Sequence, residues 1–402
     1  MPFHWNDLGL IQAYVMQKLG RKRFLLVLDD VRGDQGKWNL LENSLKSKIK
    51  GSSIIITTRF KKVTSTMGTI PPHRLGGLSE DDCWSLFSYY AFGSKGKIKQ
   101  NLVSIGQDIV KKCSGSPLAA RTLGSLLRLR SDENQWTIAK FGNLKEMKNP
   151  IMTTLKLSFH NLSARSRQCF AYCSLFPKDY CMQKEELVHL WLANGLLQFD
   201  IGDMEPEDMG ENVFCELMLH PFFQDIREDN EGNITTFKVH DLLHDLASLV
   251  MKSERPRVIE VGMESDVNYH HYKIKPRHLS IILLPLPLRA SFDLIHRFFL
   301  SSHRHLRTLL LFSRHSEALL HLSPRDISTL SGLKYLRVFN GSGNFTLETL
   351  PPTFRKLKLL RYLNLSRCYL SSLPAEPFCG MENLQIFYLS YNGEIKTIPD
   401  SI

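Results

Sequence analysis

Two unbroken apolar runs lie near the start of the chain, at residues 24–28 and 54–56, and each ends in polar residues. Apolar runs without alternation are typical of strands that are covered on both faces in a parallel sheet. Apolar positions recur with helical spacing before the first run, at residues 10–19, and a helical stretch, 38–49, separates the two runs. The first segment is therefore predicted to contain a βαβ unit of the α/β class.

The polar residues that follow the two runs are predicted to lie at one edge of this sheet. Asp29 and Asp30 follow the first run, and Thr57, Thr58 and Arg59 follow the second. Ligands of open α/β sheets bind at the carboxyl edge of the strands. An apolar strand that ends in two aspartates has the Walker B pattern, in which one carboxylate holds Mg²⁺ near phosphates and the other polarises water. The same pair is equally compatible with a solvated loop.

The pattern becomes helical after residue 77. Ser79 and Asp82 have the spacing of a capping box before an apolar stretch, residues 102–113 repeat apolar positions every three or four residues, and Pro117 stands where a further helix would begin. Residues 151–252 then read as a series of helices, a β-hairpin around residues 230–233 and a closing helix. This order is typical of a winged-helix domain.

A leucine repeat dominates the last hundred residues. The pattern L-x-x-L-x-L fits "LRTLLL", "LKYLRV", "LRYLNL" and "LQIFYL", whose first residues are Leu306, Leu333, Leu360 and Leu384. The resulting periods of 27, 27 and 24 residues are those of a leucine-rich repeat. Such repeats stack into a solenoid, and because the sequence ends within a repeat, the solenoid is expected to be truncated.

Composition and charge exclude several classes of protein. The chain has 43% hydrophobic and 23% charged residues, no secretory signal and no apolar run long enough for a membrane span, so a cytoplasmic location is expected. Its eight cysteines form no C-x2-C pair, which favours reduced core thiols, Cys169 and Cys173 included, over zinc or disulfides. The net charge of +11 is spread along the chain, which favours a solvated basic surface over a nucleic-acid patch.

A phosphate-binding loop is missing from this sequence. The string G-x-x-x-x-G-K-[ST], whose backbone N–H groups cradle phosphates, occurs nowhere in the 402 residues. The usual order also places that loop further upstream of the Walker B strand than this sequence reaches. The vestigial motifs therefore predict a protein that is not an enzyme, since turnover requires the lysine and the Mg²⁺-binding hydroxyl of that loop.

Taken in order, these segments resemble plant nucleotide-binding leucine-rich-repeat (NB-ARC) disease resistance proteins of the non-TIR type, truncated at both ends. "FLLVLDDV" and "GSSIIITTR" look like the kinase-2 motif and the motif after it, "CSGSPLAA" like GLPLA, "CFAYCSLFPKDY" like the motif of the non-TIR class, and "VHDLLHDLA" like MHD. The chain departs from the family pattern at Arg32, Ser116 and Val239, where tryptophan, leucine and methionine are usual.

The resemblance implies a multidomain α/β fold. A partial P-loop NTPase-like parallel sheet that lacks the P-loop is expected at residues 1–76, and a helical subdomain at 77–150. A winged helix is expected at 151–252, a connector with one or two strands at 253–300, and a leucine-rich-repeat solenoid at 301–402. ADP or ATP with Mg²⁺ is the cofactor that the resemblance implies.

The resemblance also implies roles for individual residues. Asp29 corresponds to the acid that binds Mg²⁺, Asp30 to its neighbour poised for hydrolysis, Arg59 to the phosphate sensor, Pro117 to the proline against the base, and His240 to the histidine that holds the β-phosphate of ADP. Asp29, Arg59, Pro117 and His240 are accordingly expected to converge on one cleft that fits a diphosphate.

Two of these residues have a simpler structural interpretation beside the functional one. Pro117 can simply start a helix, and His240 can simply cap the last helix of the winged-helix domain, which Asp241 opens. The resemblance gives Asp241 the task of helping to hold this domain closed.

Several functions follow as hypotheses. The first is a switch in plant defence that ADP closes and ATP opens. Its repeats sense an effector or a host protein on their concave strand face, and the open form can self-associate. The second is a degenerate interaction module that no longer binds nucleotide. The third is a nucleic-acid binder that uses the helix at residues 184–197, which is disfavoured because that helix is rich in leucine and tryptophan.

Overall fold

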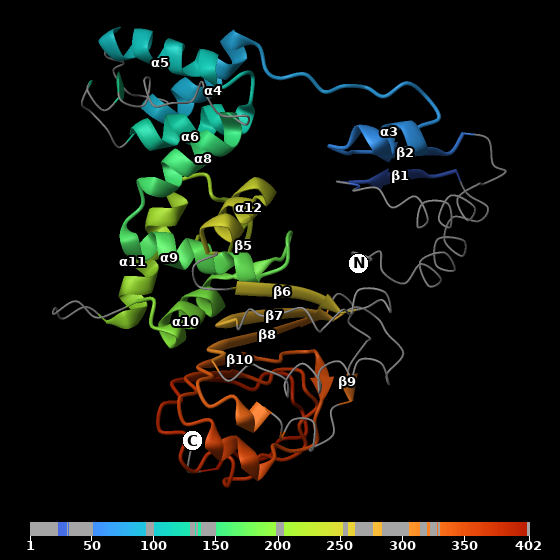
Figure 1. Ribbon diagram of the computed structural model, residues 1–402, viewed down its shortest axis with the longest axis vertical. Helices are drawn as coiled ribbons and strands as arrows, with labels where there is room; N and C mark the ends of the chain where they lie inside the picture. Colours follow the sequence, from blue (N-terminus) through green and yellow to red (C-terminus); the bar gives the residue numbers. More distant parts are fainter. Residues whose placement is uncertain are drawn as a thin grey trace. The chain divides into compact units, whose positions relative to one another are not determined.

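The fold is taken from a computed structural model (Figure 1). It describes residues 23–29, 31, 51–93, 100–128, 133, 136–137, 150–197, 205–251, 256–261, 276–283, 305–313, 320–321, 328 and 330–399. The predicted helices at 10–19 and 38–49, and Asp30, lie outside the described residues. The chain divides into two compact units, residues 1–76 and 77–402, and each is described by itself.

The first unit contains the predicted parallel strands. Strand β1 (Leu25–Leu28) pairs in parallel with β2 (Ser53–Ile56), and helix α3 (Lys61–Met67) follows. Val63 and Met67 of α3 pack with Leu28 on one face of this pair. On the other face the exposed fractions are large for apolar side chains: Leu25 64%, Val27 56% and Ile55 50%. Helix α3 covers one face; the helices expected at 10–19 and 38–49 lie outside the described residues, so cover on both faces stays a prediction.

The second unit begins with a helical module. It comprises α4 (Glu80–Phe92), α5 (Gln100–Lys112) and α6 (Pro117–Arg128). The predicted capping box is confirmed in modified form: Ser79 Oγ accepts a hydrogen bond of 3.1 Å from Asp82 N and donates one of 2.7 Å to the Asp82 carboxylate. The core of the module is apolar and includes two fully buried aromatic rings, Phe87 and Trp136.

The winged-helix domain has the predicted helices and hairpin. Its helical segments are α8 (Pro150–His160), α9 (Ala164–Tyr172), η1 (Cys173–Leu175), α10 (Lys184–Asn194), α11 (Pro206–Met218) and α12 (Asp241–Val250). The hairpin strands β4 (Phe223–Glu228) and β5 (Ile234–Val239) are antiparallel. A short strand that the sequence pattern did not predict, β3 (Met182–Gln183), pairs with the other edge of β5.

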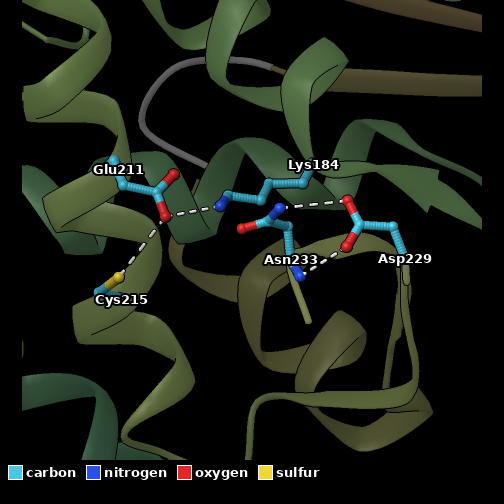
Figure 2. Close-up of polar contacts among 5 residues, drawn as sticks. All are labelled: Lys184, Glu211, Cys215, Asp229 and Asn233. Atoms are coloured by element: carbon cyan, nitrogen blue, oxygen red, sulfur yellow. Dashed lines mark hydrogen bonds and ion pairs between the residues drawn. The ribbon is translucent and has the colours of Figure 1, made fainter. Parts of the chain in front are cut away.

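Two polar contacts fix the periphery of this domain (Figure 2). The Asp229 carboxylate accepts a hydrogen bond of 2.9 Å from the backbone N–H of Asn233, as Figure 2 shows. It accepts another of 2.9 Å from the backbone N–H of Glu231, and the two bonds close the tip of the hairpin. Lys184, the first residue of α10, forms a 2.5 Å ion pair with Glu211 of α11. The ammonium group at the start of α10 is thus directed to α11.

The repeats form one parallel sheet in the order β13-β12-β10-β8-β7-β6. Its strands are β6 (Pro256–Val261), β7 (His278–Leu283), β8 (Thr308–Ser313), β10 (Val338–Asn340), β12 (Tyr362–Asn364) and β13 (Ile386–Tyr388). Figure 1 shows β6, β7, β8 and β10 side by side. The two strands of the predicted connector, β6 and β7, are therefore members of the repeat sheet.

Smaller elements accompany this sheet outside its main strands. The short strands β9 (Leu320–His321) and β11 (Phe345–Thr346) pair in parallel. The 3₁₀ turns η4 (Leu330–Gly332) and η5 (Pro352–Lys356) precede the next strands of the solenoid, and Leu330 and Phe354 of these turns are buried in its interior.

The register of the second repeat differs from the sequence prediction. Phe339, not Leu336, lies beside Leu309 and Leu363 in the sheet, and Val338 lies beside Thr308 and Tyr362. Leu336 therefore corresponds to Leu306 and Leu360, and the repeat that was assigned to begin at Leu333 begins three residues later. The pattern was ambiguous because the second repeat has leucines at 330, 333 and 336, and both Leu333 and Leu336 fit the first position of the motif.

The side chains of the repeat strands alternate between two cores. One set fills the interior of the solenoid: Leu279, Ile281, Leu309, Leu311, Phe339, Leu363 and Phe387. The intervening set packs with the winged-helix domain instead: Ile282, Leu310, Phe312, Val338, Tyr362, Ile386 and Tyr388. This alternation is the period of two that a strand requires. From β7 to β13 both faces of the sheet are thus covered, one by the solenoid interior and one by the winged helix.

Candidate functional site

The first candidate site is the carboxyl edge of β1 and β2. The Thr57 hydroxyl donates a hydrogen bond to the Asp29 carboxylate, and Val31 N donates to Thr57 O at 2.9 Å. The Thr58 hydroxyl donates to Val31 O at 2.7 Å. Parallel pairing places the residues after each strand together, so Asp29 and the segment that leads to Arg59 share one edge, as the sequence pattern predicted.

The chemistry of this edge fits a metal-bound phosphate. Asp29 is exposed and supplies carboxylate oxygen, and the exposed Arg59 supplies a guanidinium group from the same edge. Mg²⁺ is commonly held by one or two carboxylates together with the phosphates of its ligand, rather than by a complete protein cage. In the part of the chain that the structure describes, no cluster of three metal-ligating side chains exists, and this mode of binding requires none.

Pro117 is held by a tight loop at the start of α6. Ser116 caps this helix, because its hydroxyl accepts a hydrogen bond of 3.3 Å from Ala119 N. A backbone hydrogen bond joins the loop to the segment before α4: Leu78 N donates to Gly115 O at 2.8 Å. Gly115 in this loop has a φ of +75°. Ser116, which stands where the family usually has leucine, supplies the side chain that caps the helix. Pro117 itself is exposed at the first position of the helix.

His240 caps α12, as its structural interpretation predicted. Its Nδ1 accepts a hydrogen bond of 3.2 Å from Leu242 N. The neutral ring therefore carries its proton on Nε2, an N–H donor that suits a phosphate oxygen. The cap uses the Nδ1 atom of the ring. Asp241 opens the helix directly behind the cap.

The predicted nucleotide residues fall into both units of the chain. Asp29 and Arg59 belong to the first unit, and Pro117 and His240 to the second. Within the second unit, Pro117 and His240 begin helices α6 and α12, which both pack on α8. The predicted convergence of all four residues on one cleft stays a prediction.

A second candidate site, which the sequence did not predict, is the contact of α10 with the repeat sheet. Near the start of α10, Glu186 Oε1 accepts hydrogen bonds from Asn340 Nδ2 at 2.7 Å and from the Tyr362 hydroxyl at 3.2 Å. One turn along, His189 Nδ1 lies 2.6 Å from the Tyr388 hydroxyl. Burial is the main cause that raises the pKa of Glu186, Tyr362 and Tyr388.

The far end of α10 is held by a buried polar network. Asn194 donates to the Tyr172 hydroxyl at 2.9 Å and accepts from the Thr308 hydroxyl at 2.7 Å. His278 Nδ1 lies 2.9 Å from the same Thr308 hydroxyl, and all four side chains are buried. Arg337 Nη1 donates to the carbonyl oxygen of Asn194 at 3.1 Å, at the C-terminal end of the helix. Buried polar groups linked in this way fix one register between two domains.

A ladder of arginines stands beside this network. Arg307, Arg337 and Arg361 precede consecutive repeat strands, and the backbone N–H of each later one donates to the carbonyl of the one before, at 2.7 and 2.8 Å. Burial, followed by the charges of Arg307 and Arg361, lowers the pKa of Arg337. Part of the net positive charge is thus ordered along one edge of the sheet.

The position of α10 changes two of the sequence-based hypotheses. Leu187, Leu190 and Trp191 face the winged-helix core, while Glu186 and Asn194 face the repeats. A helix covered on both sides cannot enter a DNA groove in this arrangement, which further disfavours nucleic-acid binding. The concave strand face that was expected to meet an effector is occupied in the described repeats by the winged-helix domain, with η1 against β6 and β7 and α10 against β8 to β13. The polar residues that alternate with the core leucines, such as Asn340, were the signal that sequence reasoning overlooked.

The comparisons with known proteins agree with this order of domains. Residues 5–97 match the NB-ARC domain, 175–247 the disease resistance protein winged helix domain, and 358–402 the leucine rich repeat. Disease resistance protein RGA2 of Solanum bulbocastanum is 48% identical over 246 residues, which are 60% of this chain and 25% of that protein. RPP13-like protein 1 of Arabidopsis thaliana is 31% identical over 394 residues, 96% of this chain and 36% of that protein.

A third relative, disease resistance protein RPM1 of Arabidopsis thaliana, is 32% identical over 251 residues, 60% of this chain and 27% of that protein. The chain thus spans between a quarter and about a third of the length of these relatives. Fold and motifs define a multidomain protein with an NB-ARC segment, a winged helix and leucine-rich repeats. The chain belongs to the family of plant NB-ARC leucine-rich-repeat disease resistance proteins.

Proposed function

We propose that this chain is the switching part of a cytoplasmic plant defence receptor, in which bound nucleotide and the repeats together set the position of the winged-helix domain. It acts as a switch and not as an enzyme. The observation that supports this most strongly is the seat of α10 on the strand face of the repeats, because it couples the sensing module to the domain that carries His240. A ligand shifts such an equilibrium only through different contacts with its two states.

The nucleotide contacts in this proposal come from residues of both units. Asp29 holds Mg²⁺, Asp30 stands next to it, and Arg59 contacts a terminal phosphate. Pro117 lies against the base, and His240 donates its Nε2–H to the β-phosphate of ADP. Bound Mg²⁺ supplies charge neutralisation at the phosphates. His240 begins α12, so a diphosphate bound there favours the conformation in which this domain is closed.

The repeats provide the second input in this proposal. Their strand face holds α10 through hydrogen bonds to Glu186, His189 and Asn194. An effector or host protein that binds the same face competes with α10, and one that binds further along the solenoid can pull the sheet away from it. Either event releases the winged-helix domain for exchange of ADP by ATP and for self-association. In the described residues no helix is long and apolar enough to cross a membrane.

Nucleotide retention tests this proposal directly. The purified chain is denatured, and the released nucleotide is quantified by anion-exchange chromatography, for wild type and for His240→Ala and Asp29→Asn. We expect ADP in the wild type and about a tenfold weaker affinity in His240→Ala, the loss that one hydrogen bond to a charged group produces. His160→Ala, at an exposed histidine at the end of α8, is the matched control and should retain ADP.

The second candidate is an interaction module that works without nucleotide. The observation that favours it is the size of the apolar core shared by the winged helix and the repeats, which forms a compact body independently of the first unit. If ADP at millimolar concentration fails to bind the wild-type chain, the nucleotide switch is refuted and this module remains. If ADP binds and His240→Ala binds it equally well, the role of His240 is wrong.

A further inference from the structure

The carboxyl group of Glu186 lies between two domains, and none of the residues that the structure describes gives it a cationic partner. It occupies the first turn of α10 and accepts hydrogen bonds from Asn340 of β10 and Tyr362 of β12, which lie 154 and 176 residues further along the chain. Both donors are neutral. None of the ion pairs among the described residues includes Glu186, and the adjacent Lys184 is paired with Glu211 on α11 (Figure 2).

The groups that face Glu186 from the elements packed around it are neutral or acidic, apart from His189. Glu185 and His189 belong to the same helix, Tyr180 precedes β3, and the sheet contributes the remaining groups, Asn340, Tyr362, Asn364 and Tyr388. His189 is directed to the Tyr388 hydroxyl at 2.6 Å. On the sheet side, Arg337 binds the opposite end of α10.

We propose that Glu186 is a proton-controlled latch between the winged-helix domain and the repeats: the protonated carboxyl holds α10 on the strand face, and the carboxylate loosens it. Uptake of one proton by a carboxylate oxygen removes one negative charge from the interface. The hydrogen bond from Asn340 survives this step, since the second oxygen of the carboxyl group can carry the proton.

The direction of the effect follows from burial. Burial raises the pKa of Glu186, and the hydrogen bonds from Tyr362, Asn340 and Asn364 offset part of this rise. The N-terminus of α10 also favours a negative charge and acts in the same direction as those hydrogen bonds. Because the docked state binds the proton more tightly, the stabilisation is complete below the ordinary pKa of the free carboxyl and is lost as the pH rises through the raised pKa.

This inference does not depend on nucleotide binding. It concerns only the contact of α10 with β10 and β12, and it holds whether or not the chain retains ADP. In a receptor, the carboxylate form would keep the contact weak enough for a protein partner to open it. Such a latch explains why a glutamate without a cationic partner stands at the seat of the helix, where glutamine would make the same hydrogen bonds without a charge.

Hydrogen exchange of the complete chain tests the latch. Exchange of the α10, β10 and β12 amides is measured at pH 5.5 and 7.5, corrected for the intrinsic rates, with the helical module α4–α6 as internal reference. In the wild type, opening of α10 should be severalfold more frequent at pH 7.5. Glu186→Gln should open equally rarely at both pH values. Glu185→Gln, at the exposed neighbour in the same turn, is the matched control and should behave as the wild type.

Tyr362→Phe provides a second, independent variant. It removes one donor to the carboxylate, so the pH dependence of α10 opening should become larger than in the wild type. The proposal is overturned if Glu186→Gln keeps the wild-type pH dependence, or if Glu185→Gln abolishes it to the same extent. It is also overturned if Tyr362→Phe reduces the pH dependence, since the hydroxyl would then not be stabilising the charged form.

Discussion

His189 Nδ1 lies 2.6 Å from the Tyr388 hydroxyl, although the two residues are 199 positions apart in the sequence. The contact joins the middle of α10 to the last described strand of the repeat sheet. It is partly buried, and burial raises the pKa of the Tyr388 hydroxyl, which keeps this group a neutral hydrogen-bond partner. Together with Glu186 and Asn194, His189 attaches α10 to four strands of the repeat sheet, β8, β10, β12 and β13.

Gly124 permits the close packing of α6 on α4. A Cβ atom at this position would lie 2.7 Å from the backbone oxygen of Phe87 and 3.0 Å from Tyr90 Cβ. Because a backbone oxygen cannot move aside, Gly124→Ala should lower the free energy of unfolding of the helical module by about 1–3 kcal/mol. Gly332→Ala, where a Cβ would meet no atom within 4 Å, is the control. Urea denaturation with a probe in the helical module measures both, and equal stability of the two variants would contradict this packing.

Arg337 attaches the repeat sheet to the end of α10 through the carbonyl oxygen of Asn194. Arg337→Ala should weaken the docking of α10 by about 1 kcal/mol, because the side chain is partly exposed and its hydrogen bond is partly replaced by water. Arg355→Ala breaks only an exposed 3.5 Å ion pair with Glu376 and should have a much smaller effect. Hydrogen exchange at the α10 amides reports the docking, and an equal response of both variants would contradict the assigned contact.

His244 should make the winged-helix domain sensitive to acid. Its Nε2–H donates to Phe176 O at 2.8 Å, while its buried Nδ1 has no hydrogen-bond partner in the described structure. Burial, the largest cause, lowers the pKa of His244 from its ordinary value of 6.5. The stabilisation is therefore complete above pH 6.5 and is lost as the pH falls through the lowered pKa.

His244→Gln retains a donor for Phe176 without a titrating group, so it should reduce the loss of thermal stability between pH 7.5 and pH 5. His244 destabilises the domain as the pH falls, whereas Glu186 weakens the docking of α10 as the pH rises. The single variants His244→Gln and Glu186→Gln therefore separate the two effects. An unchanged acid sensitivity of His244→Gln would show that another group titrates.

The thiols should differ sharply in reactivity. Five cysteines are buried and three are exposed, and none is in a disulfide; the exposed ones are Cys181, Cys215 and Cys379. Burial raises the pKa of Cys113, Cys173 and Cys368 to about 12, which leaves almost no thiolate at neutral pH. Alkylation followed by mass spectrometry should label Cys181 and Cys379 in the native chain, and the buried thiols only after denaturation. Labelling of Cys173 in the native chain would contradict its burial in the core.

The sequence predicted local structure well where a cap, a turn or a short apolar run determines it. Ser79 predicted the start of α4, the apolar run before Asp29 predicted a parallel strand, and the Asn-Glu-Gly-Asn turn predicted the β4–β5 hairpin. The leucine spacing also predicted a solenoid. It misplaced the second repeat by three residues, because Leu333 and Leu336 both fit the first position of the motif. Only the pairing of Phe339 with Leu309 in the sheet shows that the repeat begins at Leu336.

The candidate sites were predictable only in part, for a physical reason. Asp29 and Thr57 could be placed together because parallel strands bring their ends to one edge. The contact of Glu186 with Asn340 and Tyr362 could not be, since hydrogen bonds between distant segments leave no local periodicity in the sequence. Polar residues at alternate strand positions showed that this face was not solenoid interior, but they could not identify the helix that covers it.

The docking of α10 on the strand face of the repeats is the claim on which this account rests, and a double-mutant cycle tests it most directly. The opening free energy of the α10 amides is measured by hydrogen exchange in wild type, His189→Ala, Tyr388→Phe and the double variant. A coupling energy of about 1 kcal/mol between the two substitutions is expected. Effects that add within about 0.3 kcal/mol would mean that His189 and Tyr388 do not interact, and would contradict the docked arrangement.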